Sequence, residues 1–142
     1  MKDVKLVYKN NTTNKIYYKF GNDIVTGKDK LIQDIVISLL TETGSNLYSP
    51  NFGTNFIKQV NSHSYNTKIP DELEVILNLA IENTKKNIIK KQIEAISYGN
   101  VIPNDELLVN LELTSIVYND QLYKWDVEIT VTTENETIKV GI

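Results

Sequence analysis

The amino-acid sequence predicts a single domain of the α+β class: an N-terminal β-hairpin, two to three helices including one long helix, and a C-terminal antiparallel β-meander. Three observations predict this class. Two β-prone runs near the N-terminus enclose a polar turn, the middle of the chain carries apolar residues at helical spacing, and residues 123–131 alternate between apolar and polar side chains. The length of 142 residues suits one domain, residues 1–142, with its own core.

The hairpin is predicted from two short runs rich in β-branched and aromatic residues. Val4–Tyr8 and Lys15–Phe20 are these runs, and five polar residues, Asn10 to Asn14, lie between them. A polar stretch between two β-prone runs is typical of a turn that joins antiparallel strands.

A first helix is predicted from Lys28 to Thr43, because apolar residues recur there every three to four positions. Gly44 follows at the place where a glycine with left-handed backbone often ends a helix. A second, shorter helix is expected within residues 51–60, around Phe52 and Phe56.

A long helix is predicted from Pro70 to about Ile96, because Pro-Asp-Glu is a favourable helix start. One continuous apolar stripe runs along it: Leu73, Ile76, Leu77, Ala80, Ile81, Thr84 and Ile88. A second stripe, rotated by roughly a right angle, consists of Ile89, Ile93 and Ile96. A surface helix needs one stripe only, so we expect its second half to be buried on two sides or to contact another chain.

The rest of the chain predicts strands. In residues 107–113 the odd positions are apolar, and the odd positions of 123–131 are Tyr, Trp, Val, Ile and Val. Turns are expected at Asn119-Asp120 and Glu134-Asn135. Thr137–Ile142 is then a third, terminal strand, and one of its sides is expected to be either an edge open to a partner or an edge guarded by Lys139.

Composition argues against several classes of function. The net charge is −3 and all fifteen basic residues are lysine, whereas a nucleic-acid binder is usually basic and uses arginine. No apolar run approaches the length of a membrane span, and no signal peptide is evident, so synthesis in a cytoplasm is expected. There is no cysteine and one histidine, His63, so we expect neither a metal site nor a cofactor.

Catalytic patterns are weak. Residues 21–29, GNDIVTGKD, approach a phosphate-binding loop, but the two glycines are one residue too far apart and Asp29 replaces the hydroxyl residue. Close carboxylate pairs could serve a glycosidase, yet each has a structural explanation; they are Glu72 and Glu74, Asp105 and Glu106, and Asp126 and Glu128. The lysines at 85, 86, 90 and 91 form either a solvated helix face or a surface for an acidic partner.

The connector after the first helix carries the most specific pattern. Gly27 and Gln33-Asp34-Ile35 precede it, and the order continues through Leu40, Thr41, Gly44, Pro50, Phe52, Gly53 and Phe56. This order resembles the baseplate wedge, or sheath-initiator, family of contractile phage tails, which has relatives in type VI secretion and other contractile injection systems. The long helix and closing meander also fit. In many members an acidic-Pro-Arg step follows the long helix; here Pro103 precedes Asn-Asp-Glu, so no residue is carried over for that contact.

The resemblance implies a structural protein without enzymatic activity, located in the tail baseplate of a virion or in an injection particle. Such proteins join wedge proteins around the tail tube and template the first ring of sheath subunits by exchanging β-strands. The implied partners are wedge proteins, sheath subunits and tube or hub proteins, with no nucleic acid and no membrane. The older lysozyme label of some members leaves a small peptidoglycan-cleaving enzyme as the alternative, and an interaction domain unrelated to tails as a third.

These expectations select three sets of residues. The sheath-binding edge is Thr137, Ile138, Lys139, Val140, Gly141 and Ile142, and its deletion is expected to leave the protein folded. The corner residues should make a rigid connector, with Gly53 allowing close backbone approach and Phe52 and Phe56 anchoring it in the core or on a neighbour. Ile89 and Ile93 are the expected contact with a wedge protein.

Overall fold

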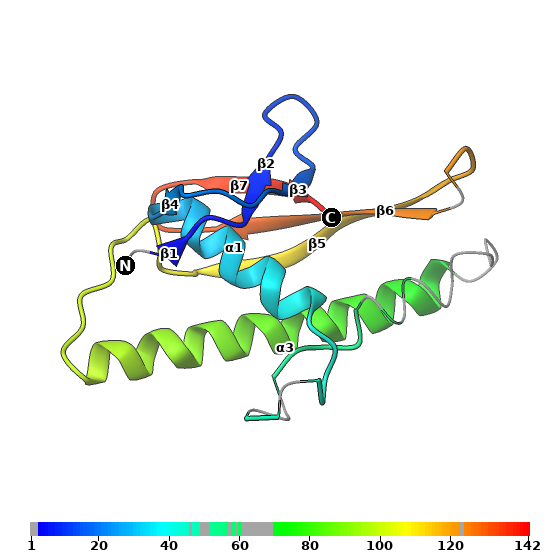
Figure 1. Cartoon of the computed structure of the whole chain (residues 1–142). Helices are drawn as coiled ribbons and strands as arrows, with labels where there is room; N and C mark the ends of the chain where they lie inside the picture. Colours follow the sequence, from blue (N-terminus) through cyan, green and yellow to red (C-terminus); the bar gives the residue numbers. More distant parts are fainter. Residues whose placement is uncertain are drawn as a thin grey trace.

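A computed structural model describes residues 3–45, 47–48, 52–56, 58, 60, 70–122 and 124–142; for residues 70 and 71 it describes the backbone alone. The α+β class is confirmed (Figure 1). Short antiparallel strand pairs come first, followed by two helices and a three-stranded antiparallel sheet. The corner residue Pro50 and His63 lie outside the described residues.

The N-terminal hairpin is present, with shorter strands than expected. β2 (Val7–Lys9) pairs with β3 (Ile16–Tyr18), whereas β1 (Asp3–Val4) pairs with β4 (Ile24–Val25). The buried side chain of Gln33 lies at the break between β1 and β2. Its Oε1 accepts the N–H groups of Leu6 and Val7 at 2.8 and 3.2 Å, and its Nε2 donates to the Val4 carbonyl at 2.9 Å. The first predicted strand is therefore divided in two around a side chain of the following helix.

The two helices follow the predicted stripes. α1 (Gly27–Leu40) buries Leu31, Ile35, Val36 and Leu39, and α3 (Pro70–Ser97) buries its first stripe apart from the half-buried Ile76. The predicted end of α1 is wrong. The helix stops at Leu40, where the Thr41 hydroxyl caps it by donating to the Ile37 carbonyl at 2.6 Å, and Gly44 lies in a separate turn. Within the predicted helix 51–60, Phe56, Lys58 and Val60 are helical.

The sheet has the order β5-β6-β7, with β5 (Asn110–Asn119), β6 (Lys124–Thr132) and β7 (Thr137–Gly141). The predicted alternation holds in β6, where Trp125, Val127, Ile129 and Val131 are buried. The predicted strand 107–113 is partly wrong: β5 begins at Asn110, after a buried Leu108 and an exposed Val109. A bulge between Leu113 and Ser115 then moves the inward positions from odd to even residues.

One core unites the elements. It lies between one face of the sheet and the two helices, and it includes Leu39 of α1, Leu77 of α3 and Ile129 of β6. α3 runs along one side of the molecule below the sheet, and α1 crosses between them (Figure 1). Among the described residues, no helix is both long and apolar enough to cross a membrane.

Candidate functional site

The third strand of the sheet is the candidate binding site, because it lies at one edge of the sheet, with β5 at the other. Within the sheet, β7 pairs with β6 over the register Thr132↔Thr137 to Glu128↔Gly141. Its side chains alternate: Ile138 and Val140 point into the core, whereas Thr137 and Lys139 are exposed. Ile142 follows the strand and donates its N–H to the Val127 carbonyl at 2.8 Å.

This register decides which backbone groups remain for a partner. The N–H of Ile142 points toward β6, and in an antiparallel ladder every second residue does the same. The backbone N–H and C=O groups of Thr137, Lys139 and Gly141 therefore point away from β6. Of these, the Gly141 N–H is already used, because it donates to the Asn14 carbonyl at 2.8 Å.

The turn of the N-terminal hairpin thus closes one end of the β7 edge. A parallel bridge joins Lys15 to Gly141, and Lys15 Nζ lies 3.0 Å from Asp126 Oδ1 on β6. A side chain at Gly141 would lie 3.1 Å from Lys15 Cγ, so glycine allows the close approach. We call these contacts of Asn14 and Lys15 the hairpin latch. Among the described residues, the predicted edge of residues 137–142 is accordingly open at Thr137 and Lys139 and covered at Gly141.

Asp126 holds the latch electrostatically. Burial tends to raise the pKa of this carboxyl, but hydrogen bonds from Lys15 and Asn119, with Asn119 Nδ2 at 3.3 Å, outweigh that effect. The pKa of Asp126 is therefore lowered from its ordinary value of 3.8. The side chain is ionised at neutral pH and binds the lysine.

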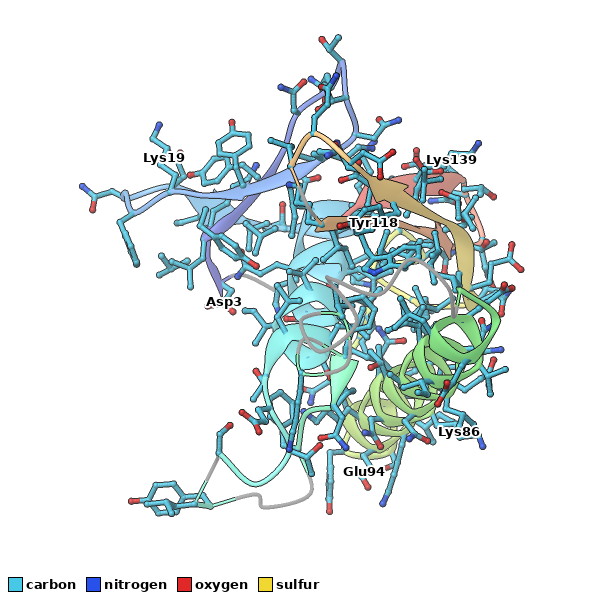
Figure 2. The ribbon with its side chains drawn as sticks, turned by 90° about the vertical axis from the view of Figure 1, so that its right-hand side faces the viewer. Asp3, Lys19, Lys86, Glu94, Tyr118 and Lys139 are labelled. Atoms are coloured by element: carbon cyan, nitrogen blue, oxygen red, sulfur yellow. The ribbon has the colours of Figure 1, made fainter. Side chains whose placement is uncertain are left out.

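A groove of about 560 Å³ runs beside the open part of β7. We call it the edge groove; it is lined by Lys5, Tyr8, Lys9, Asn11, Asn14, Lys28, Asp29, Ile32, Glu136, Thr137, Ile138 and Lys139. Lys28 Nζ pairs with Glu136 at 3.3 Å, and Lys5 Nζ pairs with Asp29 at 3.6 Å. Lys9 and Lys139 have no ion pair within the described part of the chain, so the groove presents two unneutralised cations. Figure 2 shows Lys139 pointing outward from the sheet.

The expectation that residues 137–142 can be deleted without loss of folding conflicts with their burial. Ile138 is 7% exposed and Val140 is completely buried. Removing both side chains opens the core, and large buried aliphatic residues typically contribute about 2–5 kcal/mol each. The strand is therefore a structural element as well as a candidate site.

The described corner residues Gly53 and Thr54 contact the backbone at the end of α1. Gly53 has a φ of +98°, and a Cβ there would lie 2.3 Å from the Thr41 carbonyl oxygen, so the predicted close approach is present. The Thr54 N–H donates to that carbonyl at 2.8 Å, and the Thr54 hydroxyl donates to the Leu39 carbonyl at 2.8 Å. Leu40, which ends α1, is partly buried against the core.

The two phenylalanines of the corner have different roles. Phe56 is 1% exposed and belongs to the core, so it anchors the connector within the molecule. The Phe52 ring is partly buried, with Lys91 Nζ of α3 at 4.7 Å from its centroid. Lys91 is exposed, and this contact with the Phe52 ring distinguishes it from the other lysines of the predicted cluster.

The second stripe of α3 is solvent-exposed. Ile93 is 62% exposed and Ile96 is 49% exposed, while Ile89 is partly buried. The sequence predicted that this stripe is either buried on a second side of α3 or contacts another chain. The described residues do not bury it.

The predicted carboxylate pairs do not gather into one site. Glu106 is 4% exposed and accepts the Gly27 N–H at 2.9 Å, and Asp126 binds Lys15. Glu72 and Glu74 are exposed at the start of α3.

A hollow of about 310 Å³ between the helices is bordered by Lys30, which pairs with Asp34 at 2.6 Å. Within the part of the chain that the structure describes, no group of three metal-ligating side chains occurs.

The hairpin latch and the edge groove could not be predicted from the sequence, since both join segments far apart in the chain.

Comparison with protein-family models, curated proteins and solved structures found no match to this chain.

Proposed function

We propose that this protein is a structural component of a contractile-tail baseplate, or of a related injection particle, without enzymatic activity. In this proposal it joins wedge proteins around the tail tube and templates the first sheath ring. The observation that carries it is the β7 edge, which is open at Thr137 and Lys139 beside a groove. The resemblance of residues 27–56 to sheath initiators supplies the biological setting.

The open edge suits a short added strand. Thr137 and Lys139 each offer one N–H and one C=O, and each hydrogen bond that a partner strand makes to such groups contributes about 0.5–1.5 kcal/mol. The hairpin latch at Gly141 stops the added strand at that end. A sheath segment would therefore pair over a few residues, and the surrounding side chains would supply the remaining affinity.

The charge of the edge groove specifies that segment further. Lys9 and Lys139 lack an ion pair in the described part of the chain, and both line the groove. A strand with carboxylates facing these lysines would neutralise them, whereas a basic strand would be repelled. We therefore propose an acidic sheath segment.

The contacts between the corner and α1 support a role in fixing geometry. Gly53 and Thr54 bind the connector to the end of α1, and Phe56 anchors it in the core. The exposed Ile93 and the partly buried Ile89 of α3 are proposed to contact a wedge protein during assembly. Tube or hub proteins are further proposed neighbours in the baseplate.

Binding to sheath subunits encoded by the same genome tests this function. Hydrogen exchange of the purified protein should show new protection of the Thr137 and Lys139 amides when sheath subunit is added, with no change at Ile138. A lack of binding, or binding that leaves β7 unprotected, would contradict the proposal. Loss of turbidity of cell-wall material with the protein alone would instead favour the peptidoglycan-cleaving alternative.

A further inference from the structure

A second seam runs along α3 on the side opposite the core. Its positions are spaced alternately four and three residues apart, as in a coiled coil. We call it the α3 seam: Val75, Leu79, Glu82, Lys86, Ile89, Ile93 and Ile96. The buried face of the helix, with Leu73, Leu77, Ile81 and Ile88, lies on the other side at 100° per residue.

The apolar residues near both ends of the seam are exposed to solvent. Val75 is 60% exposed, Leu79 62% and Ile93 62%. A groove of about 380 Å³ follows its second half, between Glu82 and Glu94. In Figure 2, Lys86 lies on the side of α3 that faces away from α1 and the sheet. No described residue of the chain covers this surface, and so many large apolar groups along one line indicate a binding partner.

When two copies of the seam lie antiparallel, complementary side chains face each other along its length. If a second α3 lies antiparallel, with the two-fold axis at the level of Thr84, Val75 faces Ile93 of the second copy and Leu79 faces Ile89 of the second copy. Glu82 then faces Lys86 of the second copy, and symmetry repeats all three pairs. Apolar residues meet apolar residues, and each charge meets its opposite. At the exposed rim, Ile96 faces Glu72.

A parallel pair of helices in register lacks this charge complementarity, because Glu82 would face Glu82 and Lys86 would face Lys86. Like charges at the centre of a helix pair are repulsive, whereas one buried charged layer fixes register and orientation. Lys85 already pairs with Glu82 within the chain at 4.0 Å, while Lys86 has no ion pair among the described residues. Lys86 is thus available to a second copy.

We propose that the free protein forms an antiparallel homodimer through the α3 seam. The occupant of this surface in solution is a second copy of the chain, and a wedge protein that binds Ile89 and Ile93 has to displace it or bind the dimer. The proposal does not depend on the β7 edge, which lies on a different element.

Sedimentation equilibrium of the full chain tests the dimer. The expected mass is twice the 16.2 kDa of one chain. Glu82→Lys alone and Lys86→Glu alone should each raise the dimer Kd by about a hundredfold, through repulsion at the centre. The double variant Glu82→Lys/Lys86→Glu should restore it, and the two single variants should form a heterodimer when mixed. A monomer at every concentration up to the solubility limit would overturn the proposal.

Cysteine cross-linking tests the orientation, since the chain has no cysteine of its own. A mixture of Val75→Cys and Ile93→Cys proteins should form a disulfide under mild oxidation, while Val75→Cys alone should not. Val101→Cys, at an exposed position outside α3, is the control for random collision. Efficient cross-linking of Val75→Cys to itself would contradict the antiparallel arrangement. Lys139→Pro removes an N–H that is proposed to bind the sheath, so this variant should lose sheath binding but dimerise normally. The failure of one proposal can therefore be distinguished from the failure of the other.

Discussion

Two glycines of the connector share a left-handed backbone but differ in the space around them. Gly44 and Gly53 both have positive φ, at +87° and +98°. No atom of the described residues lies within 4 Å of the position that a Cβ would take at Gly44, whereas at Gly53 the Thr41 carbonyl oxygen occupies that position. The same substitution at the two sites therefore separates the cost of left-handed backbone from the cost of a steric clash.

Gly53→Ala should lower the free energy of unfolding by about 3 kcal/mol, because it adds a backbone clash to the unfavourable φ. Gly44→Ala should cost about 1 kcal/mol, the price of the left-handed conformation alone. Urea denaturation of both variants measures the difference. Equal losses would show that the contact between Gly53 and Thr41 has no energetic consequence.

Asp126 gives the hairpin latch a pH dependence. Its pKa in the folded protein lies below the ordinary value of 3.8, so its contribution to stability is complete above that value. As the pH falls through the folded pKa, the carboxyl becomes protonated, the attraction to Lys15 is lost and the contribution disappears.

Asp126→Asn should therefore lower the free energy of unfolding at pH 7, and the difference from wild type should shrink below about pH 4. Denaturant titrations at a series of pH values measure this difference. Asp120→Asn, at an exposed turn position, is the control and should have little effect at pH 7. A difference independent of pH would show that the charge of Asp126 does not stabilise the latch.

At the scale of elements, β7 has two sides with different tasks. Its inward side chains complete the core, and its outward backbone groups at Thr137 and Lys139 are the proposed sheath contact. Proline lacks an N–H and is tolerated at edge positions whose N–H faces away from the sheet. This property allows the two tasks to be separated.

Lys139→Pro should abolish sheath binding while the far-ultraviolet circular dichroism and thermal transition stay close to wild type. Lys139→Ala keeps the N–H and removes the charge, so it should weaken binding by about tenfold through the loss of one ion pair. Affinity for purified sheath subunit measures both effects. Normal binding by the proline variant would place the contact elsewhere.

Elements governed by local pattern could be predicted from the sequence. The period-2 alternation of β6 and the apolar stripe of α3 each depend on residues near one another in the chain, and both are present. The break at Gln33, the bulge after Leu113 and the latch at Gly141 depend on contacts between distant segments. The outermost position of β7 was thus predictable, and the partial closure of its edge was not.

At the scale of the whole molecule, the chain presents two separate surfaces on one rigid core. The β7 edge with its groove is suited to an acidic strand, and the α3 seam is suited to a helix. Two independent surfaces are what a protein requires to connect other subunits at a fixed spacing. Within the described part of the chain, the predicted carboxylates are distributed over several elements.

The proposed role in sheath assembly can be tested by electron microscopy of particles from a strain that lacks this gene, with complementation by wild-type and Lys139→Pro genes. We expect tubes or baseplates without attached sheath in the deletion strain, sheathed tails with the wild-type gene and bare tubes with the proline variant. Intact sheathed tails in the deletion strain would contradict the proposed function, and tails that fail only at wall penetration would favour the enzyme instead.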